Sequence, residues 1–160
     1  TSNAGDRNGY ESSPSNAFAN DGLVATDLNS GSNTSTSCTN NGKDKHHFYN
    51  YNLNIPAGAI IQGIQVSLNA RTDNQSGNPR LCVQISWDGG TTWTTPKQTA
   101  ILGNTEITYL LGGTTDTWGR AWTAGDFSNA NFRVRIIDVA GNTSRDFFLE
   151  YLAVNVTYQP

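Results

Sequence analysis

The chain has 160 residues, of which 36% are hydrophobic and only 14% are charged, and its formal net charge is −3. A chain with this net charge is not expected to bind nucleic acid or an anionic membrane through basic residues. No apolar run approaches the roughly 20 residues that span a bilayer. The length suits one domain that spans residues 1–160. Because the chain begins at Thr1 and contains no methionine, we expect a processed product or a piece of a longer polypeptide.

The N-terminal third is rich in turn-forming residues. Residues 1–9 are small and polar and predict a loose lead-in, and residues 10–27 suit one short strand between long loops. Residues 29–45 form a Ser/Thr/Asn/Gly loop. Regular alternation of side chains between two faces begins at residues 46–54, which read HHFYNYNLN. This segment predicts a strand that ends before Pro56.

Two strands with strict alternation follow. In 60–71 the apolar residues occupy every second position, and 81–87 repeats the pattern after the turn cluster at 73–79. Across that turn we predict that the two strands pair as neighbours. Further strands are expected at 92–95, 99–102, 106–111, 132–136 and 147–158. The prediction is an all-β fold, an antiparallel, jelly-roll-like β-sandwich of about eight to ten strands.

One motif predicts a self-supporting turn. Residues 86–93 read SWDGGTTW and resemble the Asp-box, Ser-x-Asp-x-Gly-x-Thr-Trp, of sialidases and other secreted β proteins. The carboxylate of Asp88 is expected to accept hydrogen bonds from turn amides, and Trp93 is expected to pack under the hairpin. The motif occurs once, in a chain too short for a six-bladed propeller, so it implies a structural turn and no sialidase activity.

Five segments together resemble a group of sandwich modules that are appended to bacterial exported proteins and to phage-related surface proteins. They are residues 10–26 (YESSPSNAFANDGLVAT), 55–64 (IPAGAIIQGI), 115–120 (TDTWGR), 126–132 (DFSNANF) and 150–158 (EYLAVNVTY). The resemblance implies a β-sandwich and an extracellular or cell-surface location. That group has no defined catalytic residues, so the resemblance implies no activity.

The reactive residue types predict no catalytic centre. No nucleophile-elbow pattern surrounds any serine, and His46 and His47 are adjacent, so on a strand they point to opposite faces. Cys38 and Cys82 suffice for one disulfide, which suits an oxidising compartment, the alternative being two unrelated buried thiols. The module is therefore predicted not to be an enzyme.

The acidic residues raise the question of a structural calcium ion, which sandwich modules often hold between carboxylates and carbonyls. Glu150 is separated from inward-facing residues of its strand by even numbers of positions, so its side chain is expected to face the core. A buried carboxylate requires a partner that compensates its charge. The partner is either Arg133 or Arg135, or a calcium ion. The predicted calcium ligands are Asp21, Asp27 and Glu150, with Asp116 and Asp138 as further candidates.

Four tryptophans and six tyrosines suggest binding of sugars, whose C–H faces stack on aromatic rings. We place the candidate platform at Trp118, Trp122, Tyr109 and Arg120, or else at Tyr49 and Tyr51. The predicted function is a non-catalytic carbohydrate-binding module that targets a larger exported protein to a polysaccharide or cell-surface glycan. Neighbouring domains of the parent protein are the other expected partners. The alternative is a structural or adhesive module of a surface or phage appendage, which predicts buried tryptophans instead.

Overall fold

The computed structural model describes residues 1–5 and 8–160. Within these ranges the chain forms short 3₁₀ turns and strands but no α-helix, and no helix has the length and apolar character to cross a membrane. The elements, in chain order, are β1 (Ser2–Ala4), η1 (Pro14–Ala17), β2 (Ala25–Asp27), β3 (Lys45–Tyr49), β4 (Ile60–Thr72), β5 (Arg80–Ser86), β6 (Lys97–Gln98), β7 (Ile107–Gly112), η2 (Ala124–Phe127), β8 (Arg133–Val139) and β9 (Phe147–Gln159).

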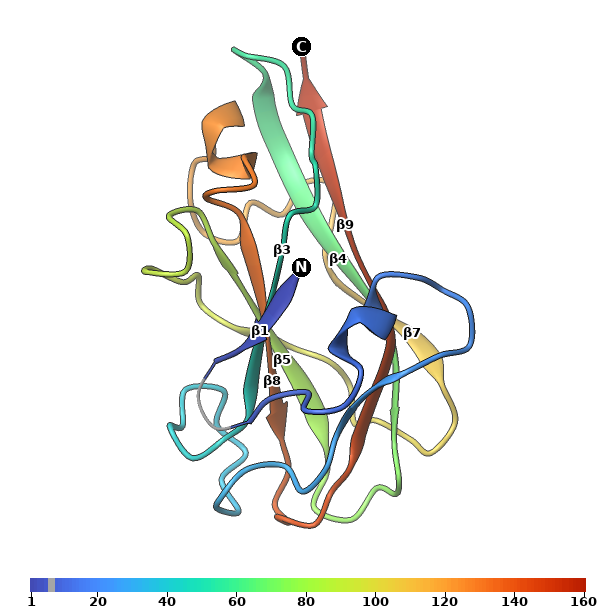
Figure 1. The fold of residues 1–160 in the computed structure, drawn as a ribbon. Coiled ribbons are helices and arrows are strands. Elements are labelled where there is room, and N and C mark those ends of the chain that lie inside the picture. The colour runs from blue at the N-terminus through green and yellow to red at the C-terminus, as the bar shows by residue number, and fades with distance from the viewer. Residues whose placement is uncertain (6–7) are drawn as a thin grey trace.

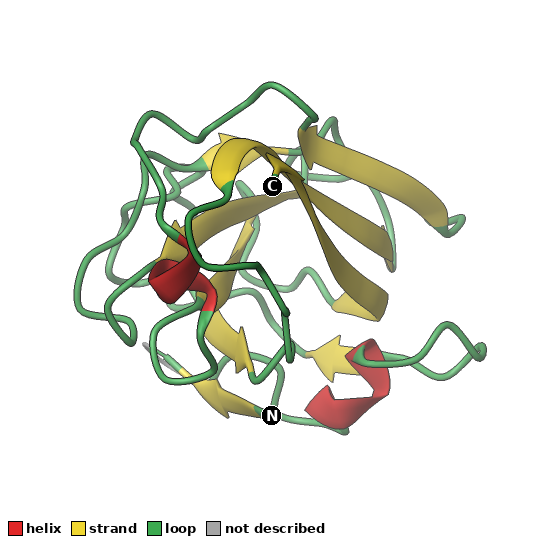
Figure 2. Cartoon of the chain, turned by 90° about the horizontal axis from the view of Figure 1, so that it is seen from above, coloured by secondary structure: helices red, strands yellow, loops and turns green. Residues whose placement is uncertain are grey.

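The strands form two antiparallel sheets that pack as the two layers of a sandwich (Figures 1 and 2). One sheet has five strands in the order β1-β3-β8-β5-β6, and the other has four in the order β2-β9-β4-β7. The long strands β4 and β9 run side by side in Figure 1 and pair along almost their whole length. The predicted all-β antiparallel sandwich is confirmed.

The core lies between the two layers, where alternation of apolar residues predicts it. Ile64, Val66 and Leu68 of β4 are fully buried, and so are Val134 and Ile136 of β8 on the opposite layer. Burying a side chain of this size stabilises the fold by about 1.5–3 kcal/mol. Each sheet thus contributes one apolar face to a single core.

The prediction that the strands at 60–71 and 81–87 pair as neighbours is wrong. β4 pairs with β9 and β7, whereas β5 pairs with β8 and β6, so the turn at 73–79 crosses from one layer to the other. Both strands still point their apolar residues at the same core, from opposite sides. Alternation identifies the inward face of a strand but not the sheet to which it belongs.

The lead-in expected at residues 1–9 contains a strand. Residues 2–4 form β1, which pairs with β3 through Ser2↔Phe48 and Ala4↔His46; residues 6 and 7 of that stretch lie outside the described residues. β1 is paired through its backbone and needs no apolar side chains, so composition does not reveal it. The strands expected at 92–95 and 99–102 are absent as strands, although Thr94 and Thr99 each donate a backbone bond to β5.

The strand predicted at 46–54 ends earlier, at Tyr49. Asn50 and Asn52 take left-handed φ values of 65° and 56°, a region that asparagine tolerates better than most residues. The backbone turns at both residues. Tyr51 and Leu53 therefore pack against the core from an irregular segment instead of continuing β3.

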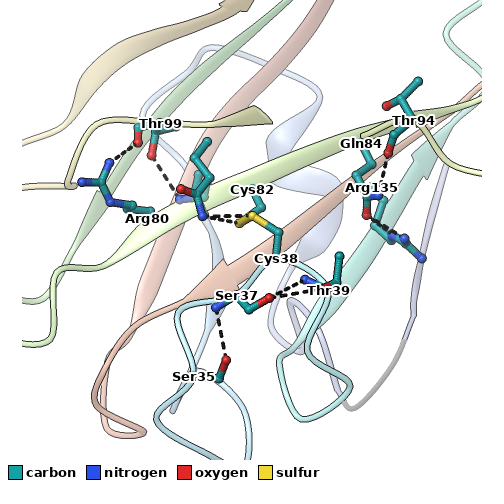
Figure 3. The surroundings of a disulfide bond; sticks show 12 residues. Ser35, Ser37, Cys38, Thr39, Arg80, Cys82, Gln84, Thr94, Thr99 and Arg135 are labelled. Atoms are coloured by element: carbon teal, nitrogen blue, oxygen red, sulfur yellow. Dashed lines mark hydrogen bonds between the residues drawn. A yellow bond between two sulfur atoms is a disulfide. The ribbon is translucent and has the colours of Figure 1, made fainter. Parts of the chain in front are cut away.

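The predicted disulfide is present, with 5.7 Å between the Cα atoms of Cys38 and Cys82 (Figure 3). Cys38 lies in the long polar loop before β3, and Cys82 lies on the outward face of β5. The pair packs against Ile137 and Val139 of β8. The disulfide therefore holds the loop against the outer surface of the five-stranded sheet.

Candidate functional site

A cleft of about 420 Å³ opens at one edge of the sandwich, and we call it the edge cleft. This volume lies within the range of small-molecule sites, which are mostly apolar and aromatic with a few polar groups. Its lining residues are Thr1, Phe18, Tyr49, Asn50, Tyr51, Leu53, Tyr151, Leu152, Ala153 and Val154. Among the described residues, four aromatic rings and no tryptophan line it.

Three segments distant in sequence bring these rings together. Tyr49 ends β3, and the left-handed Asn50 turns the chain so that Tyr51 lines the same cleft. Phe18 follows η1, is 42% exposed, and forms a single backbone bridge with Tyr151 of β9. Its ring meets the buried Phe48 edge to face, with 5.9 Å between the ring centroids. The cleft thus has one wall on each layer.

Polar groups are few in the edge cleft. The Asn50 side chain donates to the Thr1 hydroxyl at 2.7 Å. The Tyr51 hydroxyl is buried and has no hydrogen-bond partner among the described residues, and burial raises its pKa well above the ordinary value of 10.0. Flat rings beside a few amide and hydroxyl groups suit a ligand with an apolar face and polar edges, such as a sugar.

A second feature adjoins this cleft on the outer surface of the five-stranded sheet. We call it the aromatic–arginine face, and its residues are His47, Tyr49, Gln84, Trp93, Arg133 and Arg135. β3 and β8 place these side chains in register, with His47 opposite Arg135 and Tyr49 opposite Arg133. Tyr49 belongs to both the face and the edge cleft.

The platform predicted around Trp118 and Trp122 is not open to solvent. These rings are 4% and 7% exposed, and Tyr109 is 7% exposed. The indole nitrogen of Trp118 donates to the Ile64 carbonyl at 2.9 Å, so the ring is fixed against the backbone of β4. A glycine-rich segment suggests exposure, but here it lets a large ring approach the backbone closely.

Arg120 does join Trp122, as a packing partner. Its guanidinium lies 4.4 Å from the Trp122 ring centroid and 4.0 Å from that of Trp87. It also pairs with Asp126 at 3.3 Å, in the capping box of η2. The indole nitrogen of Trp122 donates to the Thr117 carbonyl at 2.7 Å. Trp118, Trp122 and Arg120 therefore stabilise a loop, and the three rings of the predicted platform, including that of Tyr109 in β7, are buried.

The predicted calcium ligands do not gather at one place, although Asp27 and Asp138 lie close to each other. Asp21 is exposed and accepts from the Leu23 amide, Asp27 is fully buried, and Asp116 pairs with Lys97 at 2.8 Å. Among the described residues, no group of three or more acidic, histidine or cysteine side chains is arranged to hold a metal ion. Calcium binding stays a prediction.

Glu150 has a different partner from those expected. A bulge between Asn69 and Ala70 breaks the register of β4 and β9, and the Glu150 carboxylate accepts from the Gly22 amide at 2.6 Å. The Asn69 side chain also donates to it, at 3.5 Å. A hydrogen bond shared with the carboxyl of Glu106 raises the pKa of Glu106 to about 7 and lowers that of Glu150. The proposed ion pair with Arg133 or Arg135 is wrong, because it required β8 and β9 to be neighbours. The two strands lie in different sheets, and both arginines lie on the aromatic–arginine face.

The sequence gives no local signal for a buried carboxyl cluster formed by Asp27, Asp44 and Asp138, each at most 1% exposed. Burial, and to a smaller extent the charge of the neighbouring Asp138, raise the pKa of Asp27 to about 12. Burial also raises the pKa of Asp138 to about 7. The Tyr10 hydroxyl donates to Asp138 at 3.1 Å, and the Gly31 amide donates to Asp44 at 2.7 Å. The cluster therefore retains protons that isolated aspartates lose.

The two histidines point to opposite faces, as predicted. His46 is buried, accepts from the Tyr10 amide at 3.1 Å, and has its pKa lowered to about 4 by burial. His47 lies on the outer face against Trp93, with 4.9 Å between the ring centroids. The two rings therefore cannot ligate one metal ion.

The turn at 86–93 makes the expected carboxylate contacts. Asp88 accepts from the backbone amides of Thr91 and Thr92 at 3.1 and 2.8 Å, and from the Ser86 hydroxyl at 2.8 Å. These hydrogen bonds lower the pKa of Asp88. Trp93, expected under the hairpin, also reaches across the sheet to His47 and Arg135.

No family model matches the chain, and no curated protein matches it. Among solved structures it is similar to one described as "CBM4 structure and function", with 9% identity and a TM-score of 0.48 over 84% of this chain and 82% of that chain. It is also similar to TmCBM61 in complex with β-1,4-galactotriose, with 8% identity and a TM-score of 0.46 over 96% and 81% of the two chains.

A further similar structure contains the CBM22-1 and GH10 modules of xylanase 10B from Clostridium thermocellum with xylohexaose. The identity is 10% and the TM-score is 0.45, and the match covers 97% of this chain but only 24% of that chain. Likenesses at these TM-scores do not assign a function.

Proposed function

We propose that the chain is a non-catalytic module that binds a carbohydrate chain in the edge cleft. The observation that carries this proposal is the convergence of Phe18, Tyr49, Tyr51 and Tyr151 on one cleft of about 420 Å³. Pyranose rings present flat C–H faces that pack on aromatic rings, while their hydroxyls bond to amide and hydroxyl groups. Asn50 supplies such an amide at the cleft.

The module is proposed to work outside the cell, where the Cys38–Cys82 disulfide persists. It acts by holding the remainder of a parent protein close to a polysaccharide or a cell-surface glycan. This role requires no chemistry at the site, because localisation alone raises the local concentration of the parent protein at its target.

Alanine at both Phe18 and Tyr151 is expected to weaken binding of a soluble polysaccharide at least tenfold. The two substitutions remove one ring from the N-terminal segment and one from β9, and each tenfold loss corresponds to about 1.4 kcal/mol of lost contact energy. Titration calorimetry against a panel of neutral and acidic polysaccharides measures the effect without relying on tryptophan fluorescence, since tyrosine and phenylalanine line the cleft.

The matched control is Phe148→Ala. Phe148 is also a half-buried aromatic residue of β9, but it stacks with Arg71, 4.0 Å from its ring centroid, and does not line the cleft. Its replacement should leave binding within about twofold of the unmodified chain. Equal losses in the control and in the cleft variant would refute the cleft as the binding site.

A structural or adhesive module of a surface or phage appendage is the second candidate. The observation that favours it is the burial of Trp118 and Trp122, which leaves these large rings without a role in ligand binding. A flat calorimetric response to the whole polysaccharide panel would favour this candidate over carbohydrate binding.

A further inference from the structure

Two arginines stand side by side on the aromatic–arginine face. Arg133 and Arg135 occupy alternate positions of β8, so both point outward, about 7 Å apart along the strand. The Arg133 guanidinium lies 4.1 Å from the centroid of the Tyr49 ring. The Arg135 guanidinium lies 4.1 Å from the centroid of the Trp93 ring. Stacking on the rings orients both guanidinium groups before any ligand arrives.

Arg133 has no anionic partner among the described residues. Its side chain donates to the backbone carbonyls of Gly89 and Asn129, both at 3.4 Å, and no ion pair among the described residues includes it. Two other arginines, Arg120 and Arg145, do pair with aspartates. The charge of Arg133 is therefore balanced by the Tyr49 ring and by solvent.

Arg135 is held more firmly than Arg133. Its Nε and Nη2 atoms donate to the side-chain oxygen of Gln84 at 3.2 and 2.6 Å (Figure 3). The Gln84 amide nitrogen in turn donates to the Thr94 carbonyl at 2.7 Å. This chain of contacts fixes the second guanidinium on the same face as the first.

We propose that the aromatic–arginine face recognises the carboxylates of an acidic polysaccharide, one built from uronic acid units; this inference rests on the proposed function. A sugar carboxylate is planar and has two oxygens, which match the parallel N–H groups of a guanidinium. Tyr49 is shared with the edge cleft, so a chain that enters the cleft continues onto Arg133. The cleft packs the sugar ring, and Arg133 selects its charge.

The test compares polygalacturonate with the same polymer after full methyl esterification, which removes the carboxylate charge and keeps the sugar backbone. In calorimetry at low salt, polygalacturonate is expected to bind at least tenfold more tightly. Arg133→Gln should reduce this preference about tenfold, and Arg133→Lys should restore only part of it, because lysine keeps the charge without the planar fork. Thermal unfolding of each variant verifies that it is folded.

Arg71→Gln is the matched control, because Arg71 also lies over an aromatic ring, that of Phe148, but on the opposite sheet. It should leave the preference intact. Equal affinity for the charged and esterified polymers, or an unchanged preference in Arg133→Gln, overturns this inference and leaves the edge cleft standing. Absence of binding to every polysaccharide overturns both proposals. Tighter binding of a single-stranded oligonucleotide that competes with polygalacturonate also overturns it, since that ligand uses the same stacking and charge.

Discussion

Replacing Asp27 with asparagine is expected to stabilise the folded chain by about 4 kcal/mol at pH 7. With the three carboxyl groups ionised, neither oxygen of Asp27 meets a hydrogen-bond donor in the part of the chain that the structure describes. A proton on Asp27 both removes the buried charge and creates a donor for Asp138. Burial and Asp138 accordingly raise the pKa of Asp27 from 3.8 to about 12. Asparagine has a similar shape, is neutral at every pH and keeps a donor for Asp138.

The effect should grow with pH. Between pH 3.8 and 12 the unfolded chain has lost the Asp27 proton and the folded chain keeps it. Folding then requires proton uptake, which costs about 1.4 kcal/mol for each pH unit above 3.8. The stability contributed by protonated Asp27 is therefore present in full below pH 3.8 and declines as the pH rises. Asp138, with its pKa raised to about 7, acts in the same direction, whereas His46, with its pKa lowered to about 4, acts in the opposite one.

Urea unfolding of both proteins from pH 4 to pH 7 measures this difference, and the contribution of His46 is common to both. The advantage of Asp27→Asn should be near zero at pH 4 and should increase steadily toward pH 7. The other charged groups around the cluster, Glu11, Lys43 and Asp44, are also unchanged. A destabilised Asp27→Asn, together with stabilisation of the unmodified chain by calcium over EDTA, would instead support the predicted calcium site at Asp27.

Removing the disulfide is expected to lower the free energy of unfolding by about 4 kcal/mol. Cys38 and Cys82 are separated by 44 positions, and closing a loop of that length restricts the unfolded chain by about this amount. The variant with alanine at both positions avoids leaving a single reactive thiol. Chemical unfolding of the variant, and of the unmodified chain with and without a reductant, measures the loss.

The reduced unmodified chain and the double variant should show similar stability, and the reductant should have no effect on the variant. Cys82 is fully buried beside Ile137 and Val139, so alanine adds a small packing loss. A change below about 1 kcal/mol would show that the loop before β3 is already ordered in the unfolded ensemble or is held by its other contacts. Those include the buried Lys43 ammonium, which donates to three backbone carbonyls.

The fold class was predictable because alternation is a local property. Val66 and Leu68 face the core whichever strands flank β4, so residues a few positions apart suffice to identify the inward face. Neighbours in a sheet are not local. β4 meets β9 between 75 positions (Thr72↔Phe147) and 99 positions (Ile60↔Gln159) later in the chain, and no feature of either strand alone specifies that pairing.

The candidate site was predictable only in part, for the same reason. Tyr49 and Tyr51 stand close together in the sequence and were one of the two places proposed for a sugar platform. Phe18 and Tyr151 join them only through the closure of the sandwich. Trp118 and Trp122 were misplaced because a polar, glycine-rich segment resembles a surface loop, and the buried carbonyls that accept their indole N–H groups are not visible in the sequence.

The position of β9 affects the order in which the module can be made. It lies between β2 and β4 in the four-stranded sheet, yet it is the last strand to leave the ribosome. Until residues 147–159 have been synthesised, β4 lacks its longest partner and β2 lacks the strand with which it pairs in the sheet. The four-stranded sheet therefore stays incomplete until the end of the module has been made, and its dependence on contacts between distant residues predicts slow folding.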